Sequence, residues 1–554
     1  MTLDEVARIL AEVERQLAGV LSAEAEPVVQ RLLNLVEQLV TEQRGLRAEV
    51  QRLRELLEQK KRSKTTAGKA ESPVGPSSDH SSEEQRRKRE PPVERPATDR
   101  RTFKPLEVHE ERECPVDPRE LPPDAVRVAD ETVIVQDIRI EPHNIRFARH
   151  VYYTAAEGRW IRGALPAGYD VGDFGPDLRS LIVALKYCGN MSEPKIRELL
   201  DNFQVPISSG SVSNILTGTA ETFADDYHAV FLAGLGSTTY QQTDDTSARV
   251  AGQFWHTHIL CNPYYTFYAT HPHKDRLTIL AVLQNTRELR FRFDATTRQW
   301  LDQGELPQVW QERVAALGER TLSAAELQAT LDTWFGAGRQ PQARLDIEQA
   351  AAIAYYRQQS DVPVVQTLVC DDAGQFKHIT DRVALCWIHA GRHYARLSPV
   401  APSHAQQLAA FQDRFWDYYA ALQRYRDGPS PVEADRLRRE FETLFSARTG
   451  YDALDDRIAK TQAKQSELLT VLSCPEVPLH NNASELGARV SARRRDVSLH
   501  SISARGVRAM DIFTTLVQTC KKLGVSAYAY LRDRLSQANQ LPRLATLIPA
   551  AAGV

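Results

Sequence analysis

Three short stretches, far apart in the chain, each carry a carboxylate that could bind a divalent cation: residues 242–246, 369–373 and 481–485. The first two follow runs of β-forming residues, so each Asp is expected where a core strand ends, and the third opens a helix. Mg²⁺ is held by a few carboxylates and keeps coordination positions open for water and phosphate oxygens. The pattern predicts one shared metal site for phosphoryl transfer on nucleic acid.

The first two stretches each contain adjacent acids, Asp244-Asp245 and Asp371-Asp372. Adjacent acids in a turn often only cap or solvate a helix start, but an acid at the end of a buried strand is costly to desolvate unless a cation compensates it. Side chains alternate along a strand, so only one Asp of each pair can face the site. We choose Asp244 and Asp371, with Asp245 and Asp372 as alternatives, and Glu485 as the third ligand.

The chain beyond Glu485 is strongly basic, which suggests contact with DNA. Guanidinium groups grip phosphate oxygens, although such a run is often just a solvated face. The candidate DNA-binding residues are Arg489, Arg493, Arg494, Arg495, Arg505 and Arg508.

A further cluster, Cys386, His389 and His393, occupies one face of an expected helix at i, i+3 and i+7. That spacing could build part of a zinc site, but a fourth ligand is not evident. We therefore expect no zinc. The preferred interpretation is that Cys386 packs with Trp387, while His389, Arg392 and His393 face DNA.

Composition bounds the class of protein. At 554 residues the chain has room for roughly three or four domains. No stretch approaches the ~18 consecutive apolar residues of a membrane span, and the acidic start is unlike a secretory signal. Seven scattered cysteines suit a reducing, cytoplasmic compartment. The net charge of −3 means that any DNA binding must come from local patches.

An N-terminal helical segment, residues 1–59, is expected to make the chain a homodimer or a higher oligomer. Its heptad places Leu32, Leu39, Leu46 and Leu53 at one seam position, with Val29, Val36, Gln43, Val50 and Leu57 at the other. Valine at a with leucine at d favours a parallel two-stranded coiled coil, and Gln43 would help to fix its register. The alternative is a single helix packed on its own domain.

The next two regions differ in composition. Residues 60–105 are charged and Ser/Pro-rich, so they are expected to form a disordered linker. Residues 106–170 contain β-rich runs at 133–140 and 146–153, which predict a small antiparallel β domain.

Residues 171–235 are expected to be helical. Cap residues and an early Pro predict helices near residues 192–200 and 209–216, joined by a tight turn. The pair suggests a helix-turn-helix for DNA binding, but the second helix has no Arg or Lys, so a purely structural helix pair is the alternative.

Residues 236–535 contain the three acidic stretches and form the expected catalytic domain. Helical insertions are predicted at about 285–358 and 400–472, where aromatic and leucine residues recur at helical spacing. Residues 536–554 are expected to be a C-terminal tail.

These features together resemble the Asp-Asp-Glu transposases of the insertion-sequence-sixty-six family. The resemblance covers most of residues 105–535. Three motifs carry it: Asp244-Asp245-Thr246, Asp371 followed by Cys386-Trp387-Ile388-His389, and Asn481-Asn482-Ala483-Ser484-Glu485 with trailing arginines. The resemblance extends to Gly175-Pro176, Leu185-Lys186-Tyr187, Leu523-Gly524-Val525 and Tyr530-Leu531.

The resemblance implies an α/β ribonuclease-H-like core with large helical insertions and two Mg²⁺ or Mn²⁺ ions. It implies a bacterial-type transposase that binds terminal inverted repeats and target DNA, with accessory transposon-encoded proteins among its candidate partners. Two departures stand out: Cys114-Pro115 has no downstream Cys pair, so a family zinc ribbon is degenerate here, and Asp245 stands where the family usually has Glu. The competing hypothesis is a non-catalytic dimeric DNA-binding protein, either a repressor or a domesticated transposase.

Overall fold

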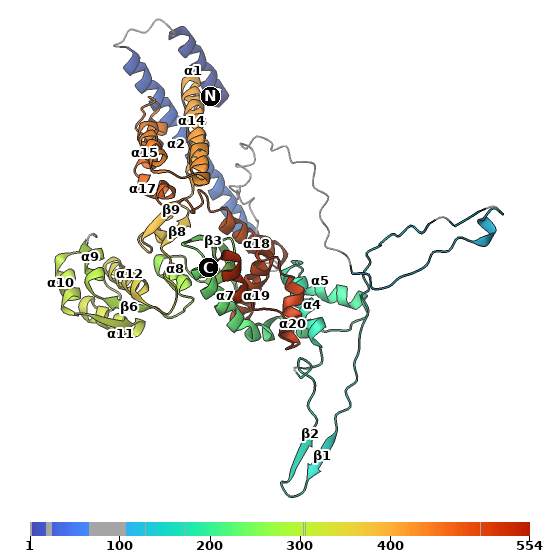
Figure 1. Ribbon diagram of the computed structural model, residues 1–554. Coiled ribbons are helices and arrows are strands. Elements are labelled where there is room, and N and C mark those ends of the chain that lie inside the picture. Colours follow the sequence, from blue (N-terminus) through green and yellow to red (C-terminus); the bar gives the residue numbers. More distant parts are fainter. Residues whose placement is uncertain are drawn as a thin grey trace.

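The computed structural model describes residues 3–17, 25–65 and 107–553, apart from residues 124, 128, 171, 303, 305 and 499. Figure 1 shows a central body of sheet and helices from which an N-terminal helical arm and a long hairpin project. The predicted linker falls outside the described residues from residue 66 onward, and its first residues, 60–65, continue a helix. None of the described helices combines the length and apolar character needed to cross a membrane.

The centre of the molecule is a mixed five-stranded sheet in the order β5-β4-β3-β8-β9. Its strands are β3 (Tyr240–Val250), β4 (Gln253–Cys261), β5 (Thr266–His271), β8 (Thr367–Cys370) and β9 (Arg382–Leu385). β3, β4 and β5 pair antiparallel, whereas β8 pairs with β3, and β9 with β8, in parallel. The expected mixed α/β fold is therefore confirmed, and this sheet is consistent with a ribonuclease-H-like core.

Local chemistry explains how the sheet is connected. Ala251 and Gly252, between β3 and β4, both adopt positive φ angles, 48° and 80°, as a two-residue hairpin turn requires. Parallel strands instead need a crossover connection. The chain between β5 and β8 supplies it through α8 (Arg276–Leu283) and the first insertion.

Helices from the middle and the end of the chain pack on this sheet. α18 (Asn482–Ser498) lies against β3 and β4, and α19 (Ala504–Lys522) lies against β5. The fully buried rings of Phe231 and Phe267 meet with centroids 4.7 Å apart, and burial of each such side chain contributes about 1.5–3 kcal/mol. The remaining elements of this body are α4 (Pro176–Tyr187), α5 (Glu193–Asn202), α6 (Ser209–Gly218), η2 (Ala220–Phe223), α7 (Ala224–Gly236), η3 (Gly374–Phe376), α13 (Trp387–Ala395), α20 (Ala527–Leu535) and α21 (Leu544–Ala552).

Two of these helices, α5 and α6, correspond to the expected helix pair. Ser208 caps α6 by accepting a hydrogen bond from the backbone of Ser211. The apolar side of α6, including Val212 and Leu216, is buried against α4 and α19. The helices are present, and their use in reading DNA stays a prediction.

The C-terminal residues do not form a free tail, contrary to the prediction for residues 536–554. α21 packs on α7, with Leu544 and Ile548 both fully buried. The apolar face of this short helix is covered by the body of the protein, and this burial is what holds the helix in place.

The first insertion, predicted to be helical over 285–358, contains a two-stranded antiparallel sheet as well. Its elements are β6 (Arg290–Phe293), α9 (Ala295–Asp302), α10 (Gln308–Ala316), β7 (Arg320–Ser323), α11 (Ala324–Phe335) and α12 (Pro341–Gln358). Leu327 and Leu331 of α11 are fully buried, as their helical spacing predicts. Strands of four residues are too short to leave a clear alternation in the sequence, so the hairpin was missed.

The second insertion is a helical module, as predicted for 400–472. It consists of α14 (Pro402–Asp427), α15 (Pro431–Phe445), α16 (Asp452–Gln462), α17 (Gln465–Leu468) and η4 (Thr470–Leu472). Trp387 of α13 inserts into it, 5.5 Å from the rings of both Phe415 and Tyr418, and donates a hydrogen bond to the carbonyl of Leu468. The insertion therefore shares one core with the central body.

The N-terminal arm consists of α1 (Leu3–Leu17) and α2 (Glu26–Thr65), and it lies beside α14 in Figure 1. Leu33, Glu37 and Val40 of α2 are buried against the second insertion. The predicted seam leucines stay exposed, Leu39 by 56% and Leu46 by 70%. The alternative of packing on its own domain therefore holds for one stripe of α2, and the coiled coil stays a prediction for the other.

The predicted β domain at 106–170 is reduced to one hairpin, β1 (Val151–Thr154) with β2 (Arg159–Arg162), preceded by η1 (Pro118–Glu120). Residues 133–140, expected to be a strand, form none. Val133, Val135 and Ile138 are each more than 70% exposed, because no neighbouring strand or helix covers their apolar alternation.

Candidate active site

The strand register brings the first two predicted acids together. Gln242 of β3 lies beside Val369 of β8 at the last parallel pair between these strands. Asp244 and Asp371 each stand two residues further on, so they extend the same register on the same face of the sheet. Asp371 follows β8, as predicted. Asp244 does not end its strand, because β3 continues and pairs with β4 up to Val250.

Glu485 lies in the first turn of α18, which runs over β3 and β4. Asn481, before the helix, is buried and donates a hydrogen bond to the carbonyl of Thr243, next to Asp244. Close approach depends on Gly487, where a Cβ would lie only 2.9 Å from the side chain of Ile259. A glycine two residues after Glu485 therefore lets the helix deliver its carboxylate to the sheet.

The charges of the other two predicted acids act on Asp244. Burial raises the pKa of Asp244 to about 8. A hydrogen bond from the Asp245 amide opposes this rise, and the nearby carboxylates of Glu485 and Asp371 add to it. Three acids in such a site repel each other unless a proton or a cation neutralises them. The donor set is made of hard carboxylate oxygens, which fits Mg²⁺ or Mn²⁺.

The two alternative acids point elsewhere. Asp245 lies 3.5 Å from Lys274 and 3.9 Å from His256, on the other face of β3. Asp372 forms ion pairs with Lys377 and Lys464. Alternation along β3 separates Asp244 from Asp245, and two lysines hold Asp372, so the choice of Asp244 and Asp371 stays a prediction.

His389 lies beside the third acid, and the DNA-facing role of its ring stays a prediction. Its Nδ1 lies 3.7 Å from Glu485 Oε1, and Arg392 Nη2 lies 3.7 Å from Glu485 Oε2. Burial lowers the pKa of His389, while Glu485 and Asp371 oppose that change. Arg392 also lies 3.0 Å from the His389 ring. His389 and Arg392, both on α13, therefore hold the carboxylate of Glu485 in place.

A second possible ligand group differs from the zinc cluster considered in the sequence. Donor atoms of Cys386, His389 and Glu485 lie within 4.8 Å of one another. His393 is instead placed beside Arg457 and Arg396, and burial and these charges lower its pKa to about 4. Burial raises the pKa of the Cys386 thiol to about 12, which disfavours the thiolate that a metal would need. The pKa of Cys386 thus disfavours a metal on this group, and the three carboxylates stay the predicted donor set.

The predicted DNA-binding arginines divide into exposed and internal side chains. Arg493 and Arg505 are exposed, and Arg489 is partly exposed. Arg494 is buried, donates to Thr514 Oγ1 and lies over the ring of Tyr187, so its predicted contact with DNA is wrong. A buried guanidinium cannot reach a phosphate on a duplex outside.

Arg495 and Arg508 have internal partners as well. Arg495 donates a 2.9 Å hydrogen bond to Thr246 and a second one to the carbonyl of Ser247, which ties α18 to β3. Arg508 lies 4.9 Å from the ring of Tyr227. Their first role is therefore to hold the two helices that carry and support Glu485.

Several basic residues near the site escaped the sequence reasoning. Lys377 lies just beyond Asp371, Lys464 belongs to the second insertion, and Arg457 and Arg396 flank His393. Lys377 could have been found from its distance to Asp371 in the sequence. Nothing in the sequence connects residues 457–464 to the site, because only the packing of α13 on α16 does so.

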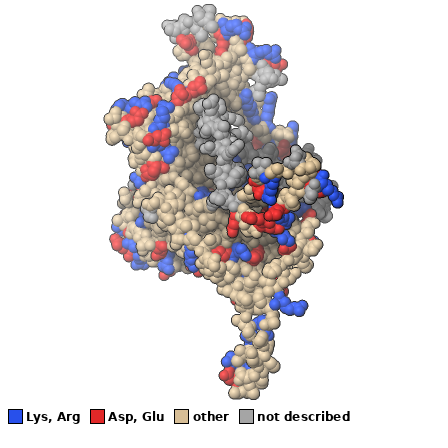
Figure 2. Space-filling model, turned by 45° about the vertical axis from the view of Figure 1, so that its right-hand side comes forward, with Lys and Arg blue, Asp and Glu red and all other residues tan. Residues whose placement is uncertain are grey.

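Over the face shown in Figure 2, basic and acidic side chains are intermixed in small groups, in line with a net charge of −3.

The fold and the site define a mixed α/β protein with an acidic centre suited to divalent cations. Residues 342–509 match the model of the Transposase IS66 family. The chain is 33% identical over 329 residues to the uncharacterized protein y4jO of Sinorhizobium fredii (strain NBRC 101917 / NGR234), an alignment that covers 58% of this chain and 99% of that protein. The chain belongs to the IS66 transposase family, which confirms the resemblance.

Proposed function

We propose that this chain is a DNA transposase that binds element ends and carries out metal-dependent cleavage and strand transfer through Asp244, Asp371 and Glu485. The observation that carries the proposal is the register of β3 and β8, which extends to the two Asp residues, together with the rise in the pKa of Asp244 caused by burial and by both other acids. Family membership supports DNA as the partner and a divalent metal as the cofactor.

The three carboxylates would hold the metal. When bound, two Mg²⁺ or Mn²⁺ ions supply the positive charge that polarises a phosphodiester and lowers the pKa of a water or DNA 3′-hydroxyl nucleophile. Asp244 is held within β3 and Asp371 directly after β8, and Asp244 Oδ1 also accepts a 2.8 Å hydrogen bond from the Asp245 amide. His389 and Arg392 hold Glu485, so its carboxylate needs little reorganisation.

Positioning of DNA follows from the exposed cations around this centre. Arg493 and Arg505 face solvent on α18 and at the start of α19, beyond Glu485. On the other side of the site, Arg396 at the end of α13 and Arg457 on α16 form a second basic group beside His393. These residues are proposed to contact the phosphates that flank the reacting one.

We also propose that the chain acts as a homodimer through the leucine stripe of α2, defined as Leu32, Leu39, Leu46 and Leu53. These side chains are 49% to 70% exposed in the single chain, although their spacing repeats every seven residues. A second copy of the same stripe is self-complementary. Val29 and Val36, at the other predicted seam position, already pack against the second insertion, so the proposed dimer contact rests on the leucine stripe.

The test is cleavage of DNA that carries the ends of the element, by the purified full chain. Asp244→Asn, Asp371→Asn and Glu485→Gln remove charge with little change of shape, and each is expected to lower Mg²⁺-dependent cleavage at least ~10³-fold. Asp245→Asn and Asp372→Asn are the matched controls and should retain most activity. All variants should still shift the DNA in Ca²⁺. Cleavage by Asp244→Asn at the wild-type rate would sink the assignment, and binding without cleavage by the wild type would favour a non-catalytic DNA-binding dimer.

A further inference from the structure

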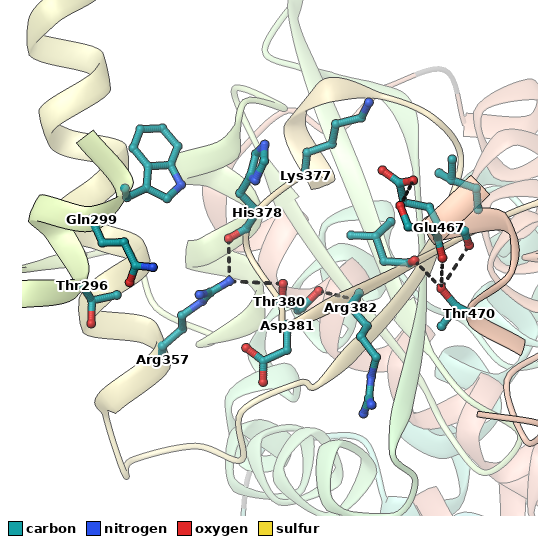
Figure 3. A pocket seen from close by; sticks show the side chains of 14 residues that line it. Thr296, Gln299, Arg357, Lys377, His378, Thr380, Asp381, Arg382, Glu467 and Thr470 are labelled. Atoms are coloured by element: carbon teal, nitrogen blue, oxygen red, sulfur yellow. Dashed lines mark hydrogen bonds between the residues drawn. The ribbon is translucent and has the colours of Figure 1, made fainter. Parts of the chain in front are cut away.

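A cavity of about 430 Å³ lies between the first insertion and β9, the outer strand of the sheet. Figure 3 shows its labelled side chains, which come from three parts of the chain: Thr296, Gln299 and Arg357 from α9 and α12 of the first insertion, residues 377–382 before and at the start of β9, and Glu467 and Thr470 from the second insertion. The cavity is thus built only when both insertions have packed on the sheet.

One wall of the cavity is the loop between β8 and β9, and it is held rigidly. Arg357 donates hydrogen bonds of 3.0 Å and 3.2 Å to the carbonyls of His378 and Thr380. Arg276 binds the same loop through the carbonyls of Lys377 and Gly374, at 3.1 Å and 3.0 Å. His378 has a φ of +69°, an unfavourable left-handed conformation for a non-glycine residue that these contacts maintain.

The wall presents two aromatic rings. The rings of His378 and Trp300 lie 6.3 Å apart at 87°, and the guanidinium of Arg276 lies 5.8 Å from the indole. Hydroxyl and amide groups of Thr296 and Gln299 are placed beside them. Flat apolar surface with donors and acceptors at its rim is what a nucleobase needs for stacking and for edge recognition.

The charges argue against a phosphate inside the cavity. Asp381 and Glu467 line it together with Arg357 and Arg382, so the cationic side chains are offset by acids. The Arg357 guanidinium is also already occupied by loop carbonyls. A phosphate is better placed at the rim, where Lys377 lies 3.5 Å from Asp372, the neighbour of Asp371.

The loop connects the cavity to the candidate active site. It starts at Asp371, and within seven residues reaches Lys377 at the rim and His378 in the wall. A duplex is too wide for a space of about 430 Å³, so only a base that has left its pair can enter. Resting on the proposed DNA cleavage, we propose that this cavity takes an unpaired nucleobase of the strand next to the phosphodiester that is cut.

The experiment uses the full chain and element-end DNA that carries 5-iodouracil at single positions around the cleavage point. With binding in Ca²⁺, irradiation should crosslink one position to Trp300 or His378, as located by mass spectrometry. Trp300→Ala should lower cleavage about tenfold with duplex affinity changed less than about twofold, and Trp300→Phe should retain most activity because it keeps a flat ring. An unpaired or abasic nucleotide at the crosslinked position should change how much Trp300→Ala lowers cleavage. It should not change the effect of the control Trp310→Ala on cleavage; the Trp310 ring packs on Phe335.

The outcomes separate the two proposals. Wild-type protein that never cuts element ends would overturn the proposed function itself. Wild-type cleavage without a crosslink to the cavity, or with Trp300→Ala as active as wild type, would overturn the cavity assignment and leave the metal site intact. A defect in Trp300→Ala that Trp300→Phe shares, and that altered base pairing does not change, would make Trp300 a structural residue and would likewise overturn the assignment.

Discussion

The carboxylate of Glu37 in α2 accepts a 2.8 Å hydrogen bond from the backbone N–H of Ala401, the residue before α14. It accepts a second one, of 2.6 Å, from Val400, and His404 Nδ1 lies 3.4 Å away. Burial alone would raise the pKa of Glu37, but these contacts hold it below its ordinary value. An acid in the first third of α2 thus satisfies two backbone amides directly before a helix of the second insertion.

We expect Glu37→Ala to release the N-terminal arm. Two buried amides would lose their acceptor, at a cost of about 1–3 kcal/mol each. Hydrogen exchange in residues 26–57 should accelerate, while exchange in the central sheet should change little. Glu42→Ala, on the exposed side of the same helix, is the control. Unchanged exchange in the Glu37 variant would show that the docking rests on the apolar contacts of Leu33 and Val40 alone.

The leucine stripe of α2 is expected to control the oligomeric state. Leu39→Glu combined with Leu46→Glu should convert a dimer into a monomer in light scattering, because charges in a coiled-coil seam are not compensated. Both leucines are exposed in the single chain, so the melting temperature of the catalytic core should not fall. Gln38→Glu, one residue before Leu39 but off the seam, should leave the dimer intact. A mutant that remains dimeric would place the interface elsewhere.

Arg493 and Arg494 are adjacent but should behave differently. Arg493→Ala removes an exposed charge, so DNA affinity should fall and the slope of log K against log salt should decrease by about one. Arg494→Ala removes a buried partner of Thr514 and should lower stability by about 1–3 kcal/mol, with an unchanged salt slope. Fluorescence anisotropy at several salt concentrations and thermal melting measure the two effects. A lower stability for Arg493→Ala together with a changed salt slope for Arg494→Ala would contradict the observed exposure of Arg493 and burial of Arg494.

Asp511 should make stability depend on pH. Burial raises its pKa to about 7, although hydrogen bonds from Thr270 oppose the rise. The unfolded chain loses this proton near pH 4 and the folded chain keeps it to about pH 7, so stability falls by about 1.4 kcal/mol per unit as pH rises between these values. Asp511→Asn should flatten the dependence of the melting temperature on pH in this range. Parallel curves for wild type and variant would exclude Asp511 as the cause.

Much of the site could be predicted because it depends on local pattern. β-forming runs predicted both Asp244 and Asp371 at strand ends, which holds for Asp371 and not for Asp244, and Asn481 ahead of Glu485 placed that acid at a helix start. The heptad of residues 29–57 predicted a long helix, and α2 is one. Each of these inferences needs only the periodicity and the preferences of neighbouring residues.

What the sequence by itself determined, then, is the type of each element and the kind of chemistry its side chains could do. Only the tertiary structure decided how these residues are arranged: the parallel register of β3 and β8 directs Asp244 and Asp371 to the same end of the sheet, and packing sends Arg494 inward while Arg493 stays out. It also left residues 133–140 without a partner despite their strand-like alternation. The reason is that pairing and burial depend on contacts between residues hundreds of positions apart in the sequence. A local pattern does not indicate which surface will cover it.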